Sequence, residues 1–141
     1  MGSFRSADEF REVIDRTFEM MSTDPEMGPK LRDAETPQRF EFPDMDMVLN
    51  VTHVEEVGDQ NLRWAWTDDV DWEPDVEMTM DSHIANRYFQ GKENIAIAMA
   101  RRRIKSSGSP KKALALIPVT KPIYKRYREM IEREYPHLVE S

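Results

Sequence analysis

The sequence predicts an α+β fold in which helices cover a mainly antiparallel sheet of four or five strands. Residues alternate between apolar and polar in three segments, as is typical of strands: 40–54, 62–66 and 76–80. Apolar residues recur at helical spacing near the N-terminus and through most of the chain after residue 82. A length of 141 residues suits one domain with its own core, so we expect a single domain over residues 1–141.

The first helix is predicted over residues 7–22. Ser6 and Glu9 are spaced as in a capping box, in which the serine side chain accepts a hydrogen bond from the third helical N–H. The apolar stripe that follows is expected to pack on the sheet: Phe10, Val13, Ile14, Phe18 and Met21. Residues 23–38 are rich in Pro, Gly and Asp and predict a connection, with one helical turn near residues 30–33.

Three strands in succession are predicted in the middle of the chain. Residues 47–54 place Met47, Leu49, Val51 and His53 on one face. Gly58 and Asp59 mark a turn into residues 62–66, and Val76, Met78 and Met80 then alternate with polar residues. Three sequential strands predict an antiparallel meander.

Two short helices are predicted after the third strand. Asp81 and Ser82 can cap the first, and Gly91 ends it because glycine adopts the left-handed cap conformation at no steric cost. Asn94 opens the second, which is apolar nearly all round. We therefore expect this second helix to be buried.

A fourth strand and two more helices complete the prediction. Residues 101–107 indicate a strand, and Ser109-Pro110 is a cap with a first-turn proline. Pro118 interrupts the helix that follows, and Thr120 can cap a last helix ending before Pro136. Because Pro118 separates it from its predecessor, the last helix is expected to be a lid over a cavity.

This succession of helix, helix, strand and helix resembles the sterol carrier protein family of lipid-transfer domains. The resemblance is carried by Gln90-Gly91-Lys92, Asn94, Ile104-Lys105, Gly108-Ser109 and residues 113–116, and it extends loosely from about Phe10 to Tyr127. The chain departs from the family pattern at Arg101-Arg102-Arg103, where Thr-Gly-Lys is frequent, and at Ser106.

The resemblance implies an apolar tunnel between sheet and helices that binds a fatty acid, a fatty acyl-CoA or a sterol without changing it. The protein would then be a non-enzymatic lipid carrier that needs no cofactor. Apolar faces of the third strand and the following helices provide the expected cavity lining: Met78, Met80, Ile84, Phe89, Ile97, Leu114, Ile117, Ile123 and Tyr127. Ten methionines would give such a lining adaptable side chains.

Charge is distributed unevenly along the chain. Residues 1–90 hold 8 Lys or Arg and 22 Asp or Glu, whereas residues 91–141 hold 12 and 5, and the net charge of −7 argues against nucleic acid as a partner. The basic residues are expected to form a rim for an anionic head group or an anionic membrane surface: Arg101, Arg103, Lys105, Lys111 and Lys112. The alternative is that the acidic residues in 68–75 neutralise this rim within the fold.

Several other chemistries lack their motifs. The chain has no cysteine, so a disulfide, a thiolate metal site and a cysteine nucleophile are all excluded. An EF-hand count from Asp69 puts Pro74 at the glycine and Met80 at the bidentate carboxylate, so we predict no metal site. The sequence shows no nucleotide-binding glycine pattern. It also shows neither a membrane-spanning apolar run nor a leader, and we therefore expect a cytoplasmic protein.

An enzyme is the alternative reading. A small α+β-cone enzyme acting on a polycyclic or polyketide-like substrate would need a polar group in an apolar pocket, and His53, Tyr88 or Tyr124 could supply it. The cone fold places most of its sheet after its helices, whereas three strands here precede a helix-rich half, which favours the carrier. A scaffold or interaction subunit with a filled core stays open.

Overall fold

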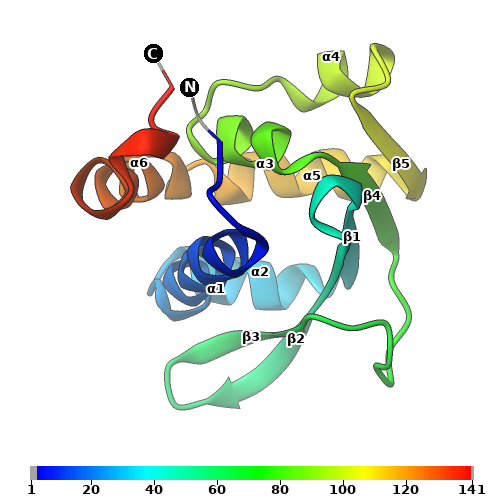
Figure 1. Cartoon of the computed structure of the whole chain (residues 1–141). Coiled ribbons are helices and arrows are strands. Elements are labelled where there is room, and N and C mark those ends of the chain that lie inside the picture. The colour runs from blue at the N-terminus through cyan, green and yellow to red at the C-terminus, as the bar shows by residue number, and fades with distance from the viewer. Residues whose placement is uncertain (1–2, 141) are drawn as a thin grey trace.

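The computed structural model describes residues 3–140, apart from the side chains of residues 56 and 57; the described residues form six α-helices, two short 3-10 helices and one five-stranded sheet. The helices are α1 (Ala7–Thr23), α2 (Met27–Ala34), α3 (Ser82–Phe89), α4 (Ile95–Ala100), α5 (Pro110–Thr120) and α6 (Ile123–Glu134). The strands are β1 (Gln38–Phe42), β2 (Met47–Val57), β3 (Gln60–Ala65), β4 (Val76–Met80) and β5 (Ile104–Gly108). The sheet bends around the helices, with α6 outermost and α4 beside β5 (Figure 1). This confirms the predicted α+β class.

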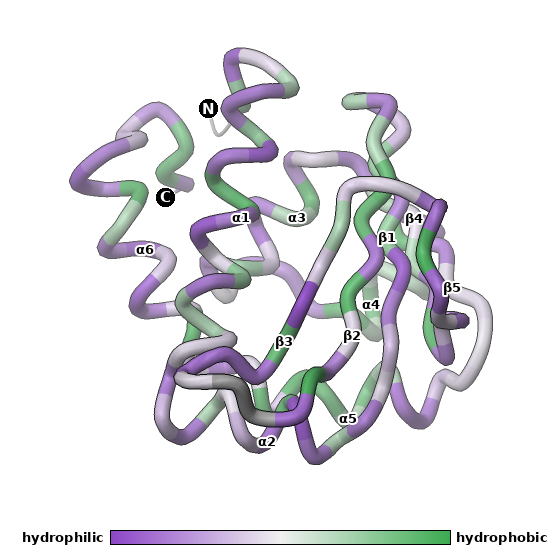
Figure 2. Tube along the Cα trace, turned by 90° about the horizontal axis from the view of Figure 1, so that it is seen from below, coloured by the Kyte–Doolittle hydropathy of each residue, from purple (hydrophilic) through white to green (hydrophobic). Residues whose placement is uncertain are grey.

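The strands lie in the order β3-β2-β1-β4-β5. β1–β2, β2–β3 and β4–β5 pair antiparallel, but β1 and β4 pair parallel, with Gln38 opposite Val76 and Phe40 opposite Met78. The predicted antiparallel meander is therefore correct for β1, β2 and β3. It is wrong for β4, which pairs with the edge of β1 opposite to β2. Hydrophobic and hydrophilic residues alternate along the strands (Figure 2), so one face of the sheet is available to the helices.

The alternation that begins near residue 40 belongs to two strands rather than one. Pro43–Met45 forms a 3-10 turn between β1 and β2, and Asp46 adopts a left-handed conformation (φ 52°). Pro43 cannot donate a ladder hydrogen bond because it has no N–H, so pairing stops there. The interruption creates β1, the strand at the centre of the sheet.

Helix α1 matches its prediction. The Ser6 hydroxyl accepts a hydrogen bond from the Glu9 N–H at 3.0 Å, and the Glu9 carboxylate accepts one from the Arg5 N–H at 3.0 Å. Every residue of its predicted stripe is buried. Phe10 meets Phe42 edge to face, with ring centroids 4.7 Å apart, so the stripe packs on the sheet as expected.

Helices α3 and α4 begin and end near the predicted residues. Asp81 is the N-cap residue of α3 without a capping bond from its side chain. Asp44, from the 3-10 turn, instead accepts hydrogen bonds from the Ser82 N–H at 2.9 Å and hydroxyl at 2.6 Å. Gly91 adopts φ 74° and ends α3, and the Asn94 side chain accepts from the Ile97 N–H at 3.0 Å to cap α4.

Two predictions around α4 are wrong. Ile95 and Ala98 are buried, but Ile97 is 48% exposed, so α4 is a surface helix. The predicted strand 101–107 begins at Ile104, because Arg102 is left-handed (φ 59°) and the N–H groups of Arg102 and Arg103 bond back to the carbonyls of Met99 and Ala98. These bonds form a Schellman cap, so Arg101 and Arg103 lie in a turn and share no strand face with Lys105.

The predicted boundary between the last two helices is also displaced. Pro118 lies inside α5, and Thr120 is the last residue of that helix rather than the cap of the next one. α6 begins at Ile123 after the N-cap residue Pro122. Ile123 and Tyr127 are fully buried, and α6 packs against α1 and α3, so this helix is part of the core. Within residues 3–140, no helix has both the length and the apolar character needed to cross a bilayer.

Substituting Gly108 tests the junction between β4 and β5. A Cβ atom at Gly108 would lie 2.2 Å from the Asp75 carbonyl oxygen, at φ 87°. We expect Gly108→Ala to lower the free energy of unfolding by about 3 kcal/mol or more in urea denaturation. The added Cβ atom would force the backbone at Asp75 or at residue 108 to move. Gly58→Ala is the matched control, since Gly58 also has a positive φ (64°) but open space around it. Equal losses for both variants would contradict this account.

Candidate functional site: an apolar cavity beside a basic groove

An apolar cavity of about 90 Å³ lies between the sheet and the helices. β4 contributes Met78 and Met80, and α3 contributes Phe89. The other helix residues in its wall are Ile14, Phe18 and Met21 of α1, Leu31 of α2, Ala85 and Tyr88 of α3, Ile95 of α4, and Ala113, Leu116, Ile117 and Thr120 of α5. This volume is well below the roughly 300 Å³ at which small-molecule pockets begin. A long chain can therefore enter only if wall side chains move.

The wall contains side chains that can move at low cost. Methionine is unbranched and has three rotatable bonds, so Met21, Met78 and Met80 can rearrange around an inserted chain. All three are buried, with exposed fractions of 8% or less. Adaptable methionine side chains therefore lie in the wall on both its helix side and its strand side, among aromatic and branched side chains such as Phe18 and Ile14.

The nine residues predicted to line a cavity are divided by the structure. Met78, Met80, Phe89 and Ile117 lie in the cavity wall. Ile84, Ile123 and Tyr127 are buried but lie outside it, whereas Ile97 and Leu114 are 48% and 43% exposed. Among the described residues, none from α6 lines the cavity.

Sequence reasoning missed the contribution of α1 and the small residue Ala113. The stripe of α1 was predicted to pack on the sheet, and it does so while also forming one wall of the cavity. Ala113 is 3% exposed and leaves space because its side chain is a single methyl group. The helical spacing of Ala113 with Leu116 was a signal that the sequence did offer.

Polar groups occupy part of the cavity wall. His53, Thr36 and Gln38 line it, as do Tyr88 and Thr120, whose hydroxyls lie 2.8 Å apart. The His53 Nδ1 atom is buried with no hydrogen-bond partner among residues 3–140, and its Nε2 atom lies 4.0 Å from the Glu35 carboxylate.

Tyr124, the third residue considered for catalysis, lies outside the cavity wall. Its ring meets that of Tyr88 edge to face, with centroids 5.7 Å apart. Burial raises the pKa of Tyr124 well above its ordinary value, so its hydroxyl stays protonated at neutral pH.

A groove of about 270 Å³ on the surface lies next to the cavity. Arg102, Arg103 and Lys105 bring positive charge to it, and Asp81 brings the single carboxylate in its wall. The remaining lining residues are Pro43, Thr79, Met80, His83 and Ile84. We call this the basic groove.

The predicted cationic rim is only partly gathered by the fold. Arg103 and Lys105 line the basic groove, while Arg101 and Lys111 are exposed elsewhere. Lys112 forms an ion pair with Asp75 at 2.9 Å, which is the neutralisation expected from the acidic segment. Arg101, Lys105 and Lys111 have no ion-pair partner within residues 3–140, so that neutralisation does not extend to them.

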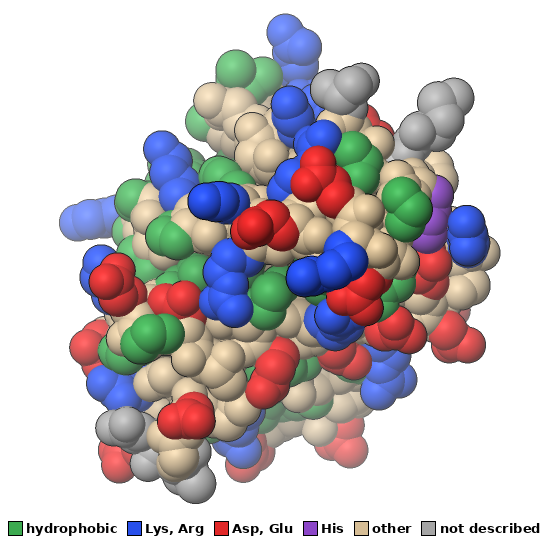
Figure 3. All heavy atoms as spheres, turned by 90° about the vertical axis from the view of Figure 1, so that its left-hand side faces the viewer, with side chains coloured by type: hydrophobic (Ala, Val, Ile, Leu, Met, Phe, Trp, Pro, Cys, Tyr) green, Lys and Arg blue, Asp and Glu red, His purple; other side chains and the backbone are tan. Residues whose placement is uncertain are grey.

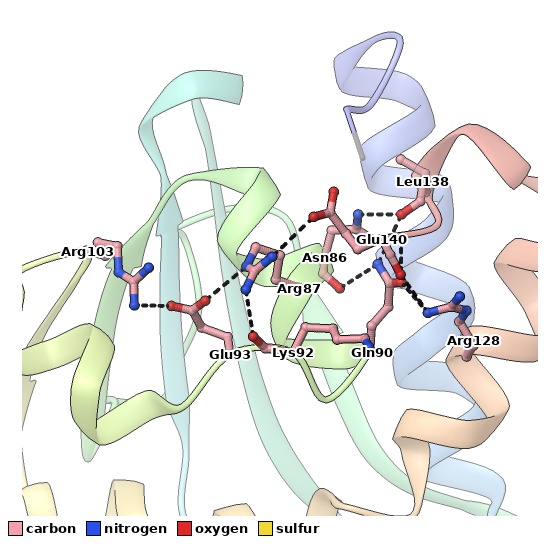
Figure 4. Close-up of polar contacts among 9 residues, drawn as sticks. All are labelled: Asn86, Arg87, Gln90, Lys92, Glu93, Arg103, Arg128, Leu138 and Glu140. Carbon is pink, nitrogen blue, oxygen red and sulfur yellow. Dashed lines mark hydrogen bonds and ion pairs between the residues drawn. The ribbon is translucent and has the colours of Figure 1, made fainter. Parts of the chain in front are cut away.

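The carboxylate of Glu93 fixes one side of the basic groove. Its side chain is 2% exposed and lies 2.7 Å from the Arg103 guanidinium and 3.1 Å from that of Arg87. The hydrogen bond to Glu93 raises the pKa of Arg87 above its ordinary value. Arg87 also reaches the Glu140 carboxylate at 3.2 Å, so the network joins α3, the β5 entry and the C-terminal segment (Figure 4).

Further contacts hold the C-terminal segment on α3. Asn86 and Gln90 donate hydrogen bonds to the Leu138 carbonyl at 2.9 and 3.0 Å, and Arg128 of α6 donates to the Glu140 carbonyl at 2.9 Å (Figure 4). α3, which carries Phe89 into the cavity wall, is thereby fixed from its outer side.

Comparisons with known proteins identify the fold. No protein-family model matches the sequence, and no curated protein matches it either. Among solved structures, UbiJ-SCP2, a ubiquinone synthesis protein, superposes with a TM-score of 0.60 at 6% identity, over 86% of this chain and 95% of that one. Sterol carrier protein 2 from Yarrowia lipolytica gives 0.57 at 13% identity, over 79% and 89%. Domain 2 of the Helicoverpa armigera sterol carrier protein gives 0.58 at 17%, over 81% and 90%.

A larger enzyme contains a similar unit. The sec-alkylsulfatase Pisa1 from Pseudomonas sp. matches 75% of this chain with a TM-score of 0.61 at 14% identity, and the chain spans 16% of that enzyme's length. Together these likenesses show that the chain has the sterol carrier protein fold, as its sequence pattern predicted.

Replacing Glu93 tests the network beside the basic groove. We expect Glu93→Gln to lower the free energy of unfolding by about 2 kcal/mol, because two guanidinium groups lose a buried counter-charge. Urea denaturation measures the change, with Glu129→Gln as the control at an exposed helical position. If the two variants are equally stable, the Glu93 carboxylate does not organise this region.

Proposed function

We propose that this protein is a non-enzymatic carrier that binds the apolar chain of one lipid in the cavity between β4 and the helices. The observation that carries the proposal is the methionine-rich apolar cavity inside a sterol-carrier-like fold. Removing a chain from water contributes roughly 25 cal/mol per Å² of apolar surface, so burial alone can give useful affinity. We place this carrier in the cytoplasm, as its sequence pattern predicts.

Cavity size favours a flexible chain as the ligand. A fatty acid or the acyl chain of an acyl-CoA can enter by displacing one side chain after another, whereas a rigid sterol needs its whole volume at once. The larger enzyme that contains a similar unit is called an alkylsulfatase, a name that is compatible with an alkyl chain as the ligand.

The enzyme alternative has one supporting observation, the unpartnered Nδ1 atom of His53 in the cavity wall. A general base needs a partner that orients it, and the nearest carboxylate, that of Glu35, is 4.0 Å away on an exposed side chain. The carrier needs no such base, and its ligand is recovered chemically unchanged.

Filling the cavity tests the carrier function. We expect Ala113→Leu to weaken the binding of dodecanoic acid by about tenfold or more in isothermal titration calorimetry, because the added methyl groups occupy the cavity. Its unfolding free energy should stay within about 1 kcal/mol of the native value. Ala115→Leu is the control, since Ala115 is exposed on the same helix. Native affinity in Ala113→Leu would place the ligand elsewhere.

Exposed apolar residues with neighbouring cations suit contact with an anionic membrane. Arg101 is the C-cap residue that follows α4, four residues after Ile97, and Lys111 lies three residues before Leu114 on α5. Neither Arg101 nor Lys111 has an ion-pair partner among the described residues. In contrast, the side of the molecule with α6 shows acidic and basic side chains interspersed (Figure 3). In our proposal, the α4–α5 side collects lipid from membranes.

Vesicle experiments test this contact. We expect Arg101→Gln/Lys111→Gln to slow fatty-acid transfer from phosphatidylserine-containing vesicles by about tenfold at low salt, with less effect on phosphatidylcholine vesicles. Salt should reduce the native rate because it screens exposed charges. The control variant is Lys125→Gln/Arg133→Gln, which removes two exposed cations from α6. A native rate that ignores both salt and vesicle charge would contradict membrane collection.

A further inference from the structure

The basic groove and the apolar cavity share one lining residue. Met80 lies in the wall of both, and it is 7% exposed. It is the last residue of β4, so its neighbours beyond the strand are the turn into α3 rather than more sheet. This side chain is unbranched and has three rotatable bonds, so it can change rotamer at low cost.

The groove has the chemistry of an oxyanion site. Arg102 and Lys105 are exposed and have no ion-pair partner within residues 3–140, while Arg103 is held at 2.7 Å by Glu93. Guanidinium groups donate paired hydrogen bonds to phosphate-like oxygens, and an ammonium adds a point charge. The Thr79 and His83 side chains supply further polar groups, and Asp81 is the one opposing carboxylate.

Arg102 occupies a position where glycine would be less strained. Its φ of 59° lies in the left-handed region, at the residue of the Schellman cap that is usually glycine. Its side chain makes no hydrogen bond or ion pair within residues 3–140 that would offset this strain. What the Arg102 side chain does contribute is a positive charge in the wall of the basic groove.

We infer that the preferred ligand is a single-chain amphiphile with a phosphate or sulfate head, bound across Met80. The head lies in the basic groove against Arg102, Arg103 and Lys105, and the chain enters the cavity past the Met80 side chain. This inference rests on the proposed carrier function and specifies its ligand class. A neutral lipid of the same chain length fills the cavity without using the groove.

Decyl phosphate and decanol, titrated below micelle-forming concentrations by isothermal calorimetry, separate the two parts of the site. We expect Arg102→Gly/Lys105→Gln to bind decyl phosphate about tenfold more weakly than the native protein and to bind decanol equally well. Its melting temperature should equal or exceed the native value, because glycine relieves the positive φ at residue 102. Loss of fold therefore cannot explain the weaker binding.

The α6 variant Lys125→Gln/Arg133→Gln has the same change in net charge, and we expect it to change decyl phosphate affinity by less than about twofold. The inference is overturned if the groove variant binds decyl phosphate as the native protein does, or if the α6 variant loses as much. It is also overturned if inorganic phosphate binds the native protein as tightly as decyl phosphate. Decanol binding in any of these cases leaves the carrier function intact, whereas failure of both decyl ligands to bind the native protein overturns both proposals.

Discussion

The parallel pairing of β1 with β4 is the interaction on which the rest of the structure depends. It joins the β1–β3 meander to the antiparallel β4–β5 pair, and without it the sheet would be two separate pieces. On the outer face, Arg39 of β1 lies 3.6 Å from Glu77 of β4 and binds Asp68 through two nitrogen atoms at 2.8 and 2.9 Å. The hydrogen bond from Arg39 lowers the pKa of Asp68, which keeps that carboxylate charged.

This pairing also determines where the cavity forms. Phe40 of β1 and Met78 of β4 are opposite each other in the register, and both lie in the cavity wall. The sheet bends around the helices (Figure 1), and Ala113 of α5 is too small to fill the space that remains. Met80 lines both the cavity and the basic groove, to which the turn into α3 and the Schellman cap after α4 also contribute.

Local sequence signals predicted local structure well. The stripe of α1, the alternation in β4 and the caps at Asn94 and Ser109 are confirmed because each depends on residues within one or two turns. The parallel β1–β4 pair was not predictable in this way, because strand order is decided by contacts distant in sequence. The strand assigned to residues 101–107 was wrong because Arg102 stands where glycine would have marked a helix end.

The candidate site was harder to predict than the fold. Hydrophobicity alone placed Ile97 and Leu114 inside. In α4, however, only Ile95 and Ala98 are buried, and in α5 the buried side is formed by Ala113 and Leu116, so Leu114 is exposed. Ala113 was missed because a small side chain marks a cavity only when its surroundings are known. The role of every lining residue in ligand binding stays a prediction.

Methyl NMR on protein labelled with ¹³C at the methionine methyl groups tests the central claim most directly. Met21, Met78 and Met80 line the cavity, whereas Met27 and Met130 are equally buried outside it. On addition of dodecanoic acid, our account predicts that the first three signals shift and show contacts to the ligand chain, while the other two stay in place. Ligand contacts that appear at exposed groups with no change at Met78 and Met80 would contradict it.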